Sequence, residues 1–425
     1  MRVLFIHQNC PGQYKHLSRV LAAEPENEVV FITRPGKPDV PGVRKVEYKA
    51  KREPARSTHY YIRNLETGVL NGQAVARAAA GLKKRGFVPD IVCAHPGWGE
   101  SLYIKDIYPD APLLNYFEFY YKSAGSDVDF DPAREVTLDD FCRVRTKNCV
   151  NLLSLEACDR GISPTRWQRA QFPKEFVNRI AVIHDGVDME AARPKADAAL
   201  ELPNGATLTR DDEVVTYVAR NLEPYRGFPT LMHALEETCR RRPDTHYVIL
   251  GGDGVSYGAK LPEGKTYREE MLSKVTIEPE RVHFMGRVPY NKYMQVLQVS
   301  SVHVYLTYPF VLSWSMLEAM SAGCLVVASE TPPVTEVIEE GRNGLLVDFF
   351  APKQIADRID EVFAHKDGMA EIRARARKTV RERYELQRCL RRQLRLINDI
   401  CARRGRAGSG TKPAAKPARR RAKGW

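Results

Sequence analysis

The segment Y-P-F-V-L-S-W-S-M-L-E-A-M-S-A-G, residues 308–323, joins a predicted strand to a predicted helix. The apolar run 301–306 before it predicts a buried strand, and Met316, Leu317 and Met320 have the spacing of a helix's inner face. A helix N-terminus beside a strand end binds anions, because unpaired backbone N–H groups and the helix dipole point at the loop. Glu318 lies about one turn into the helix, where its carboxylate can accept two vicinal hydroxyls of a ribose.

The same residues have a second interpretation, which the segment alone leaves open. Ser315 and Glu318 form the pattern S-x-x-E. This is the pattern of a capping box, in which the glutamate only closes the first turn of its own helix. The choice between a ribose-binding carboxylate and a helix cap depends on what the rest of the chain brings to this helix.

The composition predicts a globular protein of two domains, since 425 residues with 43% apolar side chains can form two cores. The apolar runs have the length of single strands, far below the roughly 20 residues that cross a bilayer. The amino terminus has too few apolar residues for a secretory signal, so we expect a cytoplasmic protein. Nine cysteines without a C-x-x-C pair are expected to be free thiols.

The net charge of +12 is concentrated at the carboxyl terminus. Residues 401–425 contain nine Lys or Arg and no acid, which leaves 12 − 9 = +3 for the first 400 residues. The body is therefore nearly balanced, and nucleic acid is not an expected partner. The tail is expected to be disordered. It is either a solubilising end or a weak contact with an anionic membrane, which would place the protein at the inner membrane face.

Strands alternate with helices along the chain, which predicts an α/β fold with parallel sheets covered on both faces. Two such doubly wound, Rossmann-like domains would face each other across a cleft that receives the loops after the strands. We expect a first domain at 1–189, a linker at 190–212, a second domain at 213–385, a helix at 386–400 that packs back on the first domain, and a tail at 401–425.

Two arginines follow the predicted strand 214–219, in the sequence A-R-N-L-E-P-Y-R-G. Arg220 and Arg226 flank a proline turn and could clamp a diphosphate, because guanidinium groups match phosphate oxygens with paired hydrogen bonds. The alternative is that these are surface arginines that pair with Glu223.

These features together resemble the family 4 glycosyltransferases of the GT-B fold, whose pattern combines G-R-L-x-x-x-K-G, a later G-x-G and the acidic pair E-x7-E. Further similar motifs are G-G-D-G at 251–254, V-I-H-D-G-V-D at 182–188, N-G-L-L-V at 343–347 and the loop 8–13 after the first strand. The resemblance covers about residues 1–390 and extends the two-domain expectation to the GT-B fold. It implies that domain 1–189 is on the acceptor side and that domain 213–385 binds the nucleotide sugar.

The resemblance implies transfer of a sugar from a UDP- or GDP-sugar to a glycan or lipid-linked acceptor, with retention of configuration and without a metal or other cofactor. Cell-surface polysaccharide or glycolipid synthesis is the implied context. The implied donor-site residues are Arg220 and Arg226 on the diphosphate, the amides near Leu312 and Ser313 on its distal phosphate, Glu318 on the ribose, and Gly252 and Gly12 in the flanking loops.

The chain departs from the family pattern at two positions. Phe310 stands where the first acid of E-x7-E, which contacts the donor sugar, is expected. Glu118 takes the place of a histidine that lies near the transferred sugar, so we assign it a catalytic or acceptor role. His95 and Trp98, in the loop after strand 91–94, are predicted to contact acceptor or sugar. Because Phe310 replaces an acid, a catalytically silent nucleotide-sugar binding protein is the alternative function.

An acidic run at 127–131, D-V-D-F-D, resembles the metal-binding D-x-D of a different glycosyltransferase fold. No predicted strand leads into it, so we expect a solvated loop there.

Overall fold

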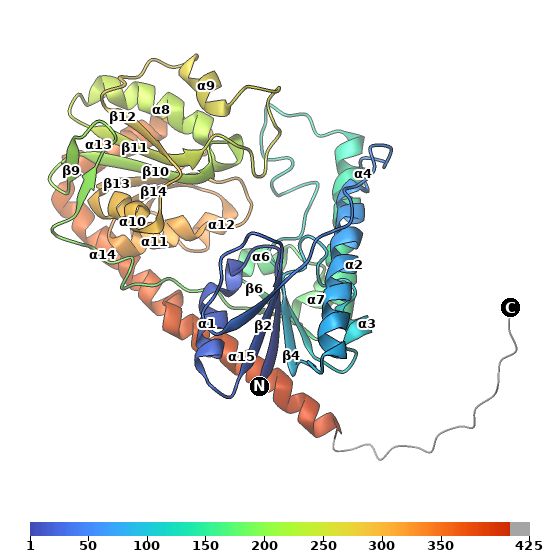
Figure 1. Ribbon diagram of the computed structural model, residues 1–425. Coiled ribbons are helices and arrows are strands. Elements are labelled where there is room, and N and C mark those ends of the chain that lie inside the picture. Colours follow the sequence, from blue (N-terminus) through green and yellow to red (C-terminus); the bar gives the residue numbers. More distant parts are fainter. Residues whose placement is uncertain (409–425) are drawn as a thin grey trace, which may run out of the picture.

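The amino-terminal domain is built on a parallel sheet of seven strands. The computed structural model describes residues 1–408, and Figure 1 shows its two domains. The strand order in this sheet is β3-β2-β1-β4-β5-β6-β7. Its strands are β1 (Arg2–Ile6), β2 (Glu28–Thr33), β3 (Val43–Glu47), β4 (Ile91–Ala94), β5 (Leu113–Tyr116), β6 (Arg160–Ser163) and β7 (Ile180–Val182).

Helices cover this first sheet. After the first residue of β1 and of β2, the residues of β1, β2 and β4 are fully or almost fully buried, which explains their continuous apolar runs. The helical segments are η1 (Gly12–Tyr14), α1 (Lys15–Ala23), α2 (Arg63–Lys84), α3 (Ile104–Ile107), α4 (Leu138–Lys147), α5 (Cys149–Ala157), α6 (Arg166–Ala170) and α7 (Lys174–Val177).

The second domain has a parallel sheet of six strands in the order β12-β11-β10-β13-β14-β15. These strands are β10 (Val214–Asn221), β11 (His246–Gly252), β12 (Val282–Gly286), β13 (Val302–Tyr305), β14 (Leu325–Ser329) and β15 (Leu345–Val347). Its helical segments are η2 (Pro224–Arg226), α8 (Phe228–Arg241), α9 (Tyr267–Leu272), α10 (Tyr290–Val299), α11 (Trp314–Ala322), α12 (Pro332–Thr335), α13 (Pro352–Ala364) and α14 (Lys366–Arg383). The predicted pair of doubly wound α/β domains is confirmed.

The segment 190–212, predicted as a linker, contains an antiparallel hairpin of β8 (Ala199–Glu201) and β9 (Thr207–Thr209). Leu200 and Leu208 from this hairpin pack with Val214, Val248 and Val296 of the second domain. The segment therefore extends the second domain, because its alternating leucines bury one face.

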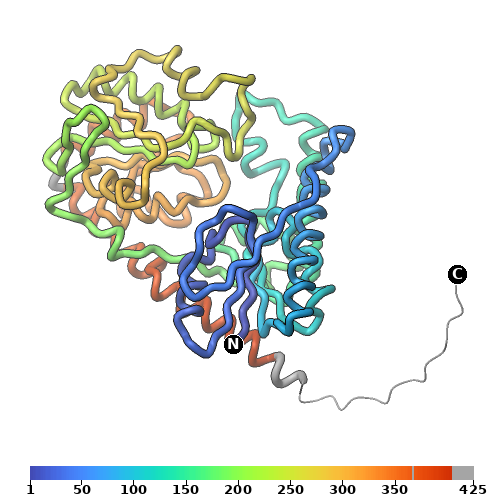
Figure 2. The backbone as a smooth tube through the Cα atoms, in the orientation of Figure 1, coloured from blue at the N-terminus to red at the C-terminus, as the bar shows by residue number. Residues whose placement is uncertain are grey.

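The last helix, α15 (Leu386–Gly408), returns to the first domain (Figures 1 and 2). The chain passes from the first domain to the second near Val187 and returns near Tyr384. These two segments lie side by side, and the Val187 amide donates to the Tyr384 carbonyl at 2.8 Å. Leu390 and Ile397 of α15 then share a core cluster with Phe5 of β1. The helix continues beyond the predicted end at 400, so residues 401–408 are helical rather than part of a disordered tail. The rest of that predicted tail lies outside the described residues.

A long loop of the first domain, residues 117–137 between β5 and α4, reaches the second domain (Figure 1). We call it the interdomain loop. The Tyr225 hydroxyl donates to Asp127 at 3.0 Å, and the Tyr308 hydroxyl donates to Asp131 at 3.3 Å. The Phe130 ring packs on Tyr308 at 4.9 Å between ring centres. The expectation of a solvated acidic loop is wrong for Asp127, which is buried and binds a tyrosine of the second domain, whereas Asp129 is exposed.

No helix within residues 1–408 is both long enough and apolar enough to cross a membrane.

The packing of α15 on the first domain can be tested with Ile397→Ala, which empties a fully buried position. We expect a loss of about 2–4 kcal/mol in the free energy of unfolding, measured by chemical denaturation. Asn398→Ala, at the exposed neighbouring position, is the control and should change stability by less than about 0.5 kcal/mol. Equal stabilities of the two variants would contradict this account of the helix.

Candidate active site

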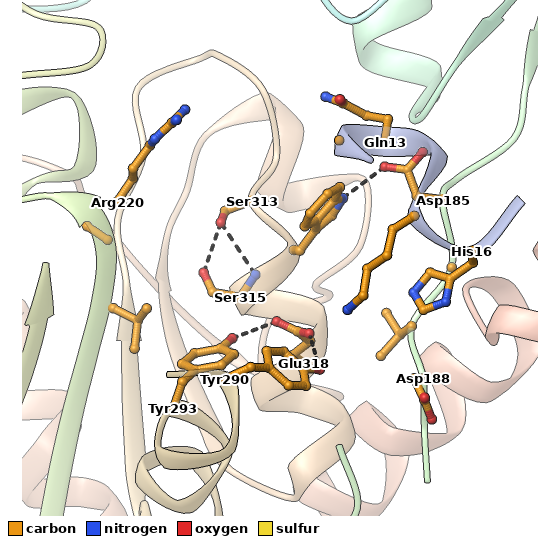
Figure 3. Close-up of a pocket in the computed structure, with 17 residues that line it drawn as sticks. Gln13, His16, Asp185, Asp188, Arg220, Tyr290, Tyr293, Ser313, Ser315 and Glu318 are labelled. Atoms are coloured by element: carbon orange, nitrogen blue, oxygen red, sulfur yellow. Dashed lines mark hydrogen bonds between the residues drawn. The ribbon is translucent and has the colours of Figure 1, made fainter. Parts of the chain in front are cut away.

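A pocket of about 350 Å³ lies between the carboxyl ends of the two sheets (Figure 3). We call it the nucleotide pocket. Arg220 lies on one side of it, Gln13 and Asp185 lie on the other, and Ser313 and Glu318 lie between them. Its lining residues are Gly12, Gln13, Lys15, His16, Asp185, Gly186, Val187, Asp188, Val218, Ala219, Arg220, Tyr290, Tyr293, Ser313, Trp314, Ser315 and Glu318.

Glu318 does not cap its helix. The N-cap of α11 is Ser313, whose hydroxyl accepts from the Ser315 amide at 3.4 Å. The Glu318 carboxylate instead accepts hydrogen bonds from the hydroxyls of Tyr290 at 2.8 Å and Tyr293 at 2.7 Å (Figure 3). Burial raises the pKa of Glu318, against the lowering effect of these two bonds. The capping box is therefore wrong, and the carboxylate faces the pocket.

Arg220 is exposed in this pocket and forms no ion pair with any described residue. The alternative of pairing with Glu223 is wrong, because Glu223 is fully buried and accepts three backbone amides, those of Ser256, Tyr257 and Gly258, each at 3.0 Å. Glu223 thus fixes the loop after β11 and leaves the Arg220 guanidinium available to a ligand.

Arg226 is buried and does not line the pocket. Its Nη1 donates to the Thr307 hydroxyl at 2.7 Å, the Val311 carbonyl at 3.1 Å and the Tyr305 hydroxyl at 3.2 Å. These bonds hold the loop between β13 and α11 from beneath. The structure therefore does not bring the two predicted arginines into one pocket, and direct contact of Arg226 with a diphosphate stays a prediction.

The loop held by Arg226 contains three residues predicted to bind the donor. Phe310 is buried against Phe119, with ring centres 4.5 Å apart, and Leu312 is buried in the core of the second domain. The Ser313 amide donates to the Tyr305 hydroxyl at 2.8 Å, so this amide already has a partner. Of the three residues, only Ser313 lines the nucleotide pocket.

Two glycines were predicted to form donor-site loops. Gly12 lines the nucleotide pocket with a φ of +50°, and a Cβ there would lie 2.8 Å from the His7 ring. Only glycine fits this position. Gly252 lies outside the pocket lining, and a Cβ there would meet Arg287 at 2.6 Å and Asn221 at 2.9 Å. Gly252 therefore leaves room for the 2.8 Å hydrogen bond from Arg287 to Asn221.

A hydrogen-bonded chain leads from His7 to Glu118. The Asn9 amide donates to His7 Nδ1 at 2.8 Å, so the proton of a neutral His7 lies on Nε2 and points to Gln13 Oε1 at 2.7 Å. Burial and the nearby His95 hold the pKa of His7 well below its usual value, which keeps it neutral. Gln13 Nε2 then donates to Glu118 Oε1 at 3.0 Å.

His95 reaches the same carboxylate from β4. Its Nδ1 accepts from the Gly97 amide, and its Nε2 lies 3.6 Å from Glu118 Oε2, a distance too long for a hydrogen bond. Burial raises the pKa of Glu118, but His95, Gln13 and Arg226 outweigh it and the net pKa is lowered. Glu118 is therefore an ionised, oriented carboxylate. Trp98 stacks on the His95 ring at 4.7 Å, and its contact with acceptor stays a prediction.

Sequence reasoning missed several residues of the pocket. Tyr290 and Tyr293 come from α10, and nothing in their local sequence marks them as partners of Glu318. Lys15, in the first turn of α1, places its ammonium 4.8 Å from the centre of the Tyr290 ring across the domain boundary. Lys15 also forms no ion pair with a described residue, so the pocket contains two cations available to an anion.

Asp185, from the motif V-I-H-D-G-V-D at 182–188, connects the two domains. Its Oδ2 accepts from Tyr116 of the first domain at 3.1 Å and from the Trp314 indole of α11 at 2.9 Å. Its Oδ1 is buried and has no hydrogen-bond partner in the described part of the chain, residues 1–408. Burial raises the pKa of Asp185 from its usual 3.8 to about 7, although both hydrogen bonds lower it. A protonated Asp185 thus favours the arrangement described.

No group of three or more His, Cys, Asp or Glu side chains in residues 1–408 converges as metal ligands do. The acids of the run 127–131 have protein partners instead. Asp127 and Asp131 accept hydrogen bonds from tyrosines, and Asp129 accepts the amides of Gly125 and Ser126.

Two facing Rossmann-like domains with a pocket between their strand ends define the GT-B class. The fold matches sucrose-phosphate synthase from Thermosynechococcus elongatus, with a TM-score of 0.72 and 17% identity over 95% of this chain and 100% of that one. It also matches HepE of Anabaena, solved with UDP and glucose, with a TM-score of 0.66 and 16% identity over 94% of this chain and 100% of that one.

Matches to family models identify the family of this chain. The family model "Glycosyl transferase family 4 group" matches residues 25–192, and "Glycosyl transferases group 1" matches residues 202–383. The chain belongs to these family 4, group 1 glycosyltransferases.

Individual relatives share less than 30% of their residues with this chain. A D-inositol 3-phosphate glycosyltransferase of Corynebacterium efficiens is 29% identical over 43% of this chain and 42% of its own length. Spore coat protein SA of Bacillus subtilis is 24% identical over 73% of this chain and 78% of its own length. The match to the first relative thus spans less than half of that protein.

The buried Asp185 predicts a dependence of stability on pH. Because its pKa in the folded protein is raised, its favourable contribution is complete below about pH 4 and is lost as the pH rises towards about 7. Asp185→Asn should therefore be more stable than wild type at about pH 8, by about 1–3 kcal/mol, since one pKa unit corresponds to about 1.4 kcal/mol. Denaturation at several pH values measures this difference.

Two results would count against this role of Asp185. The first is a difference that does not shrink towards about pH 4, the lower end of the range in which Asp185 loses its proton. The second is an equal effect of the exposed control Asp244→Asn.

Proposed function

We propose that the protein transfers a sugar from a nucleotide diphosphate sugar to a glycan or lipid-linked acceptor, with retention of anomeric configuration and without a metal ion. The single observation that carries this proposal is the composition of the nucleotide pocket. Arg220 and Lys15, two cations that form no ion pair with any residue of 1–408, share one cavity with the N-terminus of α11 and the carboxylate of Glu318.

Each part of this pocket suits one part of the donor. The guanidinium of Arg220, the ammonium of Lys15 and the helix terminus would attract the diphosphate. Glu318, oriented by two tyrosine hydroxyls, would accept hydrogen bonds from the ribose hydroxyls. We prefer uracil as the base of the donor nucleotide, because HepE of Anabaena was solved with UDP and with UDP-glucose.

We propose the following reaction. The bond between the anomeric carbon and the phosphate oxygen breaks, and its electron pair goes to that oxygen. The acceptor hydroxyl forms the new bond on the same face, and its proton passes to the departing phosphate. Arg220 and Lys15 would stabilise the charge that develops on the phosphate, which is the main term a positively charged site can supply without a metal.

Glu118 would act on the transferred sugar or on the acceptor, whereas Arg220 and Lys15 act on the phosphate. The network from His7, Gln13 and His95 keeps its carboxylate ionised and fixed. A fixed negative charge that contacts Gln13 of the nucleotide pocket would stabilise positive charge at the anomeric carbon or bind a hydroxyl of sugar or acceptor.

Phe310 favours a second candidate, a nucleotide-sugar binding protein without turnover. It lies in an aromatic cluster with Phe119, Tyr225 and Tyr257, and so offers no hydrogen bond to a sugar. Release of free nucleotide from a UDP-sugar by the purified chain would contradict this second candidate.

The donor assignment is tested with Glu318→Gln and Arg220→Ala. Glu318→Gln should weaken UDP binding by about 1.5–3 kcal/mol, the usual contribution of hydrogen bonds to a charged group. Arg220→Ala should lower kcat more than it weakens UDP binding, since the charge on the phosphate grows in the transition state. Calorimetry and a donor-hydrolysis assay give the two quantities, with the exposed Arg391→Ala as control. Unchanged binding and turnover in both variants would exclude this site.

The assignment of Glu118 is tested separately with Glu118→Gln. This change keeps the shape of the side chain and removes its charge, so kcat should fall by about 100-fold or more. UDP binding should stay at the wild-type level, because Glu118 does not line the nucleotide pocket. Wild-type turnover would contradict a catalytic role, and the exposed Glu24→Gln provides the comparison.

A further inference from the structure

A second cavity, of about 420 Å³, lies between the domains beside the interdomain loop. We call it the second pocket. Helix α4 and the interdomain loop form its wall on the first domain, and η2 and α9 form its wall on the second domain. It shares no lining residue with the nucleotide pocket. The fold therefore forms two separate binding spaces at the domain boundary.

Lys147, at the end of α4, lines the second pocket without a carboxylate partner among residues 1–408. Its ammonium lies 3.5 Å from the centre of the Tyr121 ring. Burial lowers the pKa of Lys147 to about 8, against the attraction of Asp127, so the side chain stays mainly protonated at neutral pH. A partly buried cation without a counterion is unfavourable, and an anionic ligand would relieve this cost.

The other charged groups of this cavity already have partners. Asp127 accepts from Tyr225 at 3.0 Å, and Asp131 accepts the Ala133 amide at 2.9 Å in addition to its bond from Tyr308. Arg134 and Arg143 both pair with Asp140, at 2.7 and 3.1 Å. Within residues 1–408, Lys147 is thus the charged lining group that forms no ion pair.

Tyrosine rings form the opposite wall of the second pocket. The rings of Tyr225 and Tyr308 stack with centres 4.6 Å apart and an interplanar angle of 22°, and Tyr257 and Tyr267 lie beside them. Flat aromatic surfaces next to carboxylates suit a saccharide, because the rings pack on its C–H faces while the carboxylates accept its hydroxyl hydrogens.

Direct contacts connect this cavity to the proposed reaction centre. Tyr257 lines the second pocket, lies 5.5 Å from the Arg226 guanidinium and packs on Phe310 with ring centres 4.9 Å apart. Arg226 in turn bonds to Tyr305, whose hydroxyl holds the Ser313 amide at the edge of the nucleotide pocket. A ligand in the second pocket would therefore contact Tyr257, which packs on the same Arg226 loop that leads to Ser313 in the nucleotide pocket.

We propose that the second pocket binds the acceptor, as a saccharide that carries a phosphate or carboxylate group, and that Lys147 binds this anionic group. The inference rests on the proposed function, because it assigns the second substrate of the same transfer. It names the chemical class of that substrate as an anionic sugar, and it assigns the tyrosine wall to the sugar ring.

Saturation-transfer NMR on the full chain with UDP present tests this inference. The probes are glucose 6-phosphate, glucuronic acid and neutral methyl glucoside, which separate phosphate from carboxylate and both from an uncharged sugar. At least one acidic sugar should bind at least about tenfold more tightly than the neutral one. Lys147→Gln should abolish this preference, whereas Lys147→Arg keeps the charge and should retain it. The exposed Lys84→Gln should behave as wild type.

Two results would overturn the inference: equal binding of acidic and neutral sugars by the wild type, or an unchanged preference in Lys147→Gln. The affinity for UDP, measured in parallel, separates this inference from the donor assignment. Loss of the acidic-sugar preference with wild-type UDP binding supports the role of Lys147 alone. Acidic-sugar binding by a chain that does not bind UDP would contradict the donor assignment and leave the second pocket as an anionic-sugar site.

Discussion

The buried guanidinium of Arg226 holds the part of the structure on which both pockets depend. Its three hydrogen bonds fix the loop from Thr307 to Val311, which carries the chain from β13 into α11. That loop sets where the N-terminus of α11 lies, and therefore where Ser313 and Glu318 meet the nucleotide pocket. On its other side the same arginine lies against Tyr257 of the second pocket. A single buried cation thus positions two binding surfaces.

The two domains are joined by polar contacts that are buried from solvent. Asp185 connects Tyr116 to Trp314, and the interdomain loop connects Asp127 to Tyr225. Both carboxylates have pKa values raised by burial, which hydrogen bonds from tyrosine or tryptophan only partly offset. Such contacts are satisfied only when the domains meet, so the arrangement between the domains is coupled to the protonation of these acids.

Much of the fold could be predicted from local sequence. Apolar runs that alternate with helical stretches predicted the buried parallel strands, and the A-R-N-L-E-P-Y-R-G motif placed Arg220 at a strand end. The capping box at Ser315 was wrong because the helix begins at Trp314, with Ser313 as its cap. A cap depends on backbone angles that a four-residue pattern does not determine.

The partners of the site residues could not be predicted, because they are distant in sequence. Gln13 meets Glu118 across 105 residues, and Tyr225 meets Asp127 across 98. Arg226 was predicted to bind phosphate because the sequence gives its charge but does not reveal that its side chain is buried. The second pocket was missed for the same reason, since Lys147 lies on one domain and the tyrosines lie on the other.

A crystal structure of the full chain with a UDP-sugar, grown with a metal chelator, tests the central claim most directly. The account predicts that the diphosphate lies within hydrogen-bonding distance of Arg220 and the N-terminus of α11, with the ribose hydroxyls on Glu318. A nucleotide bound elsewhere, or one that leaves Arg220 and Glu318 without contacts, would contradict it.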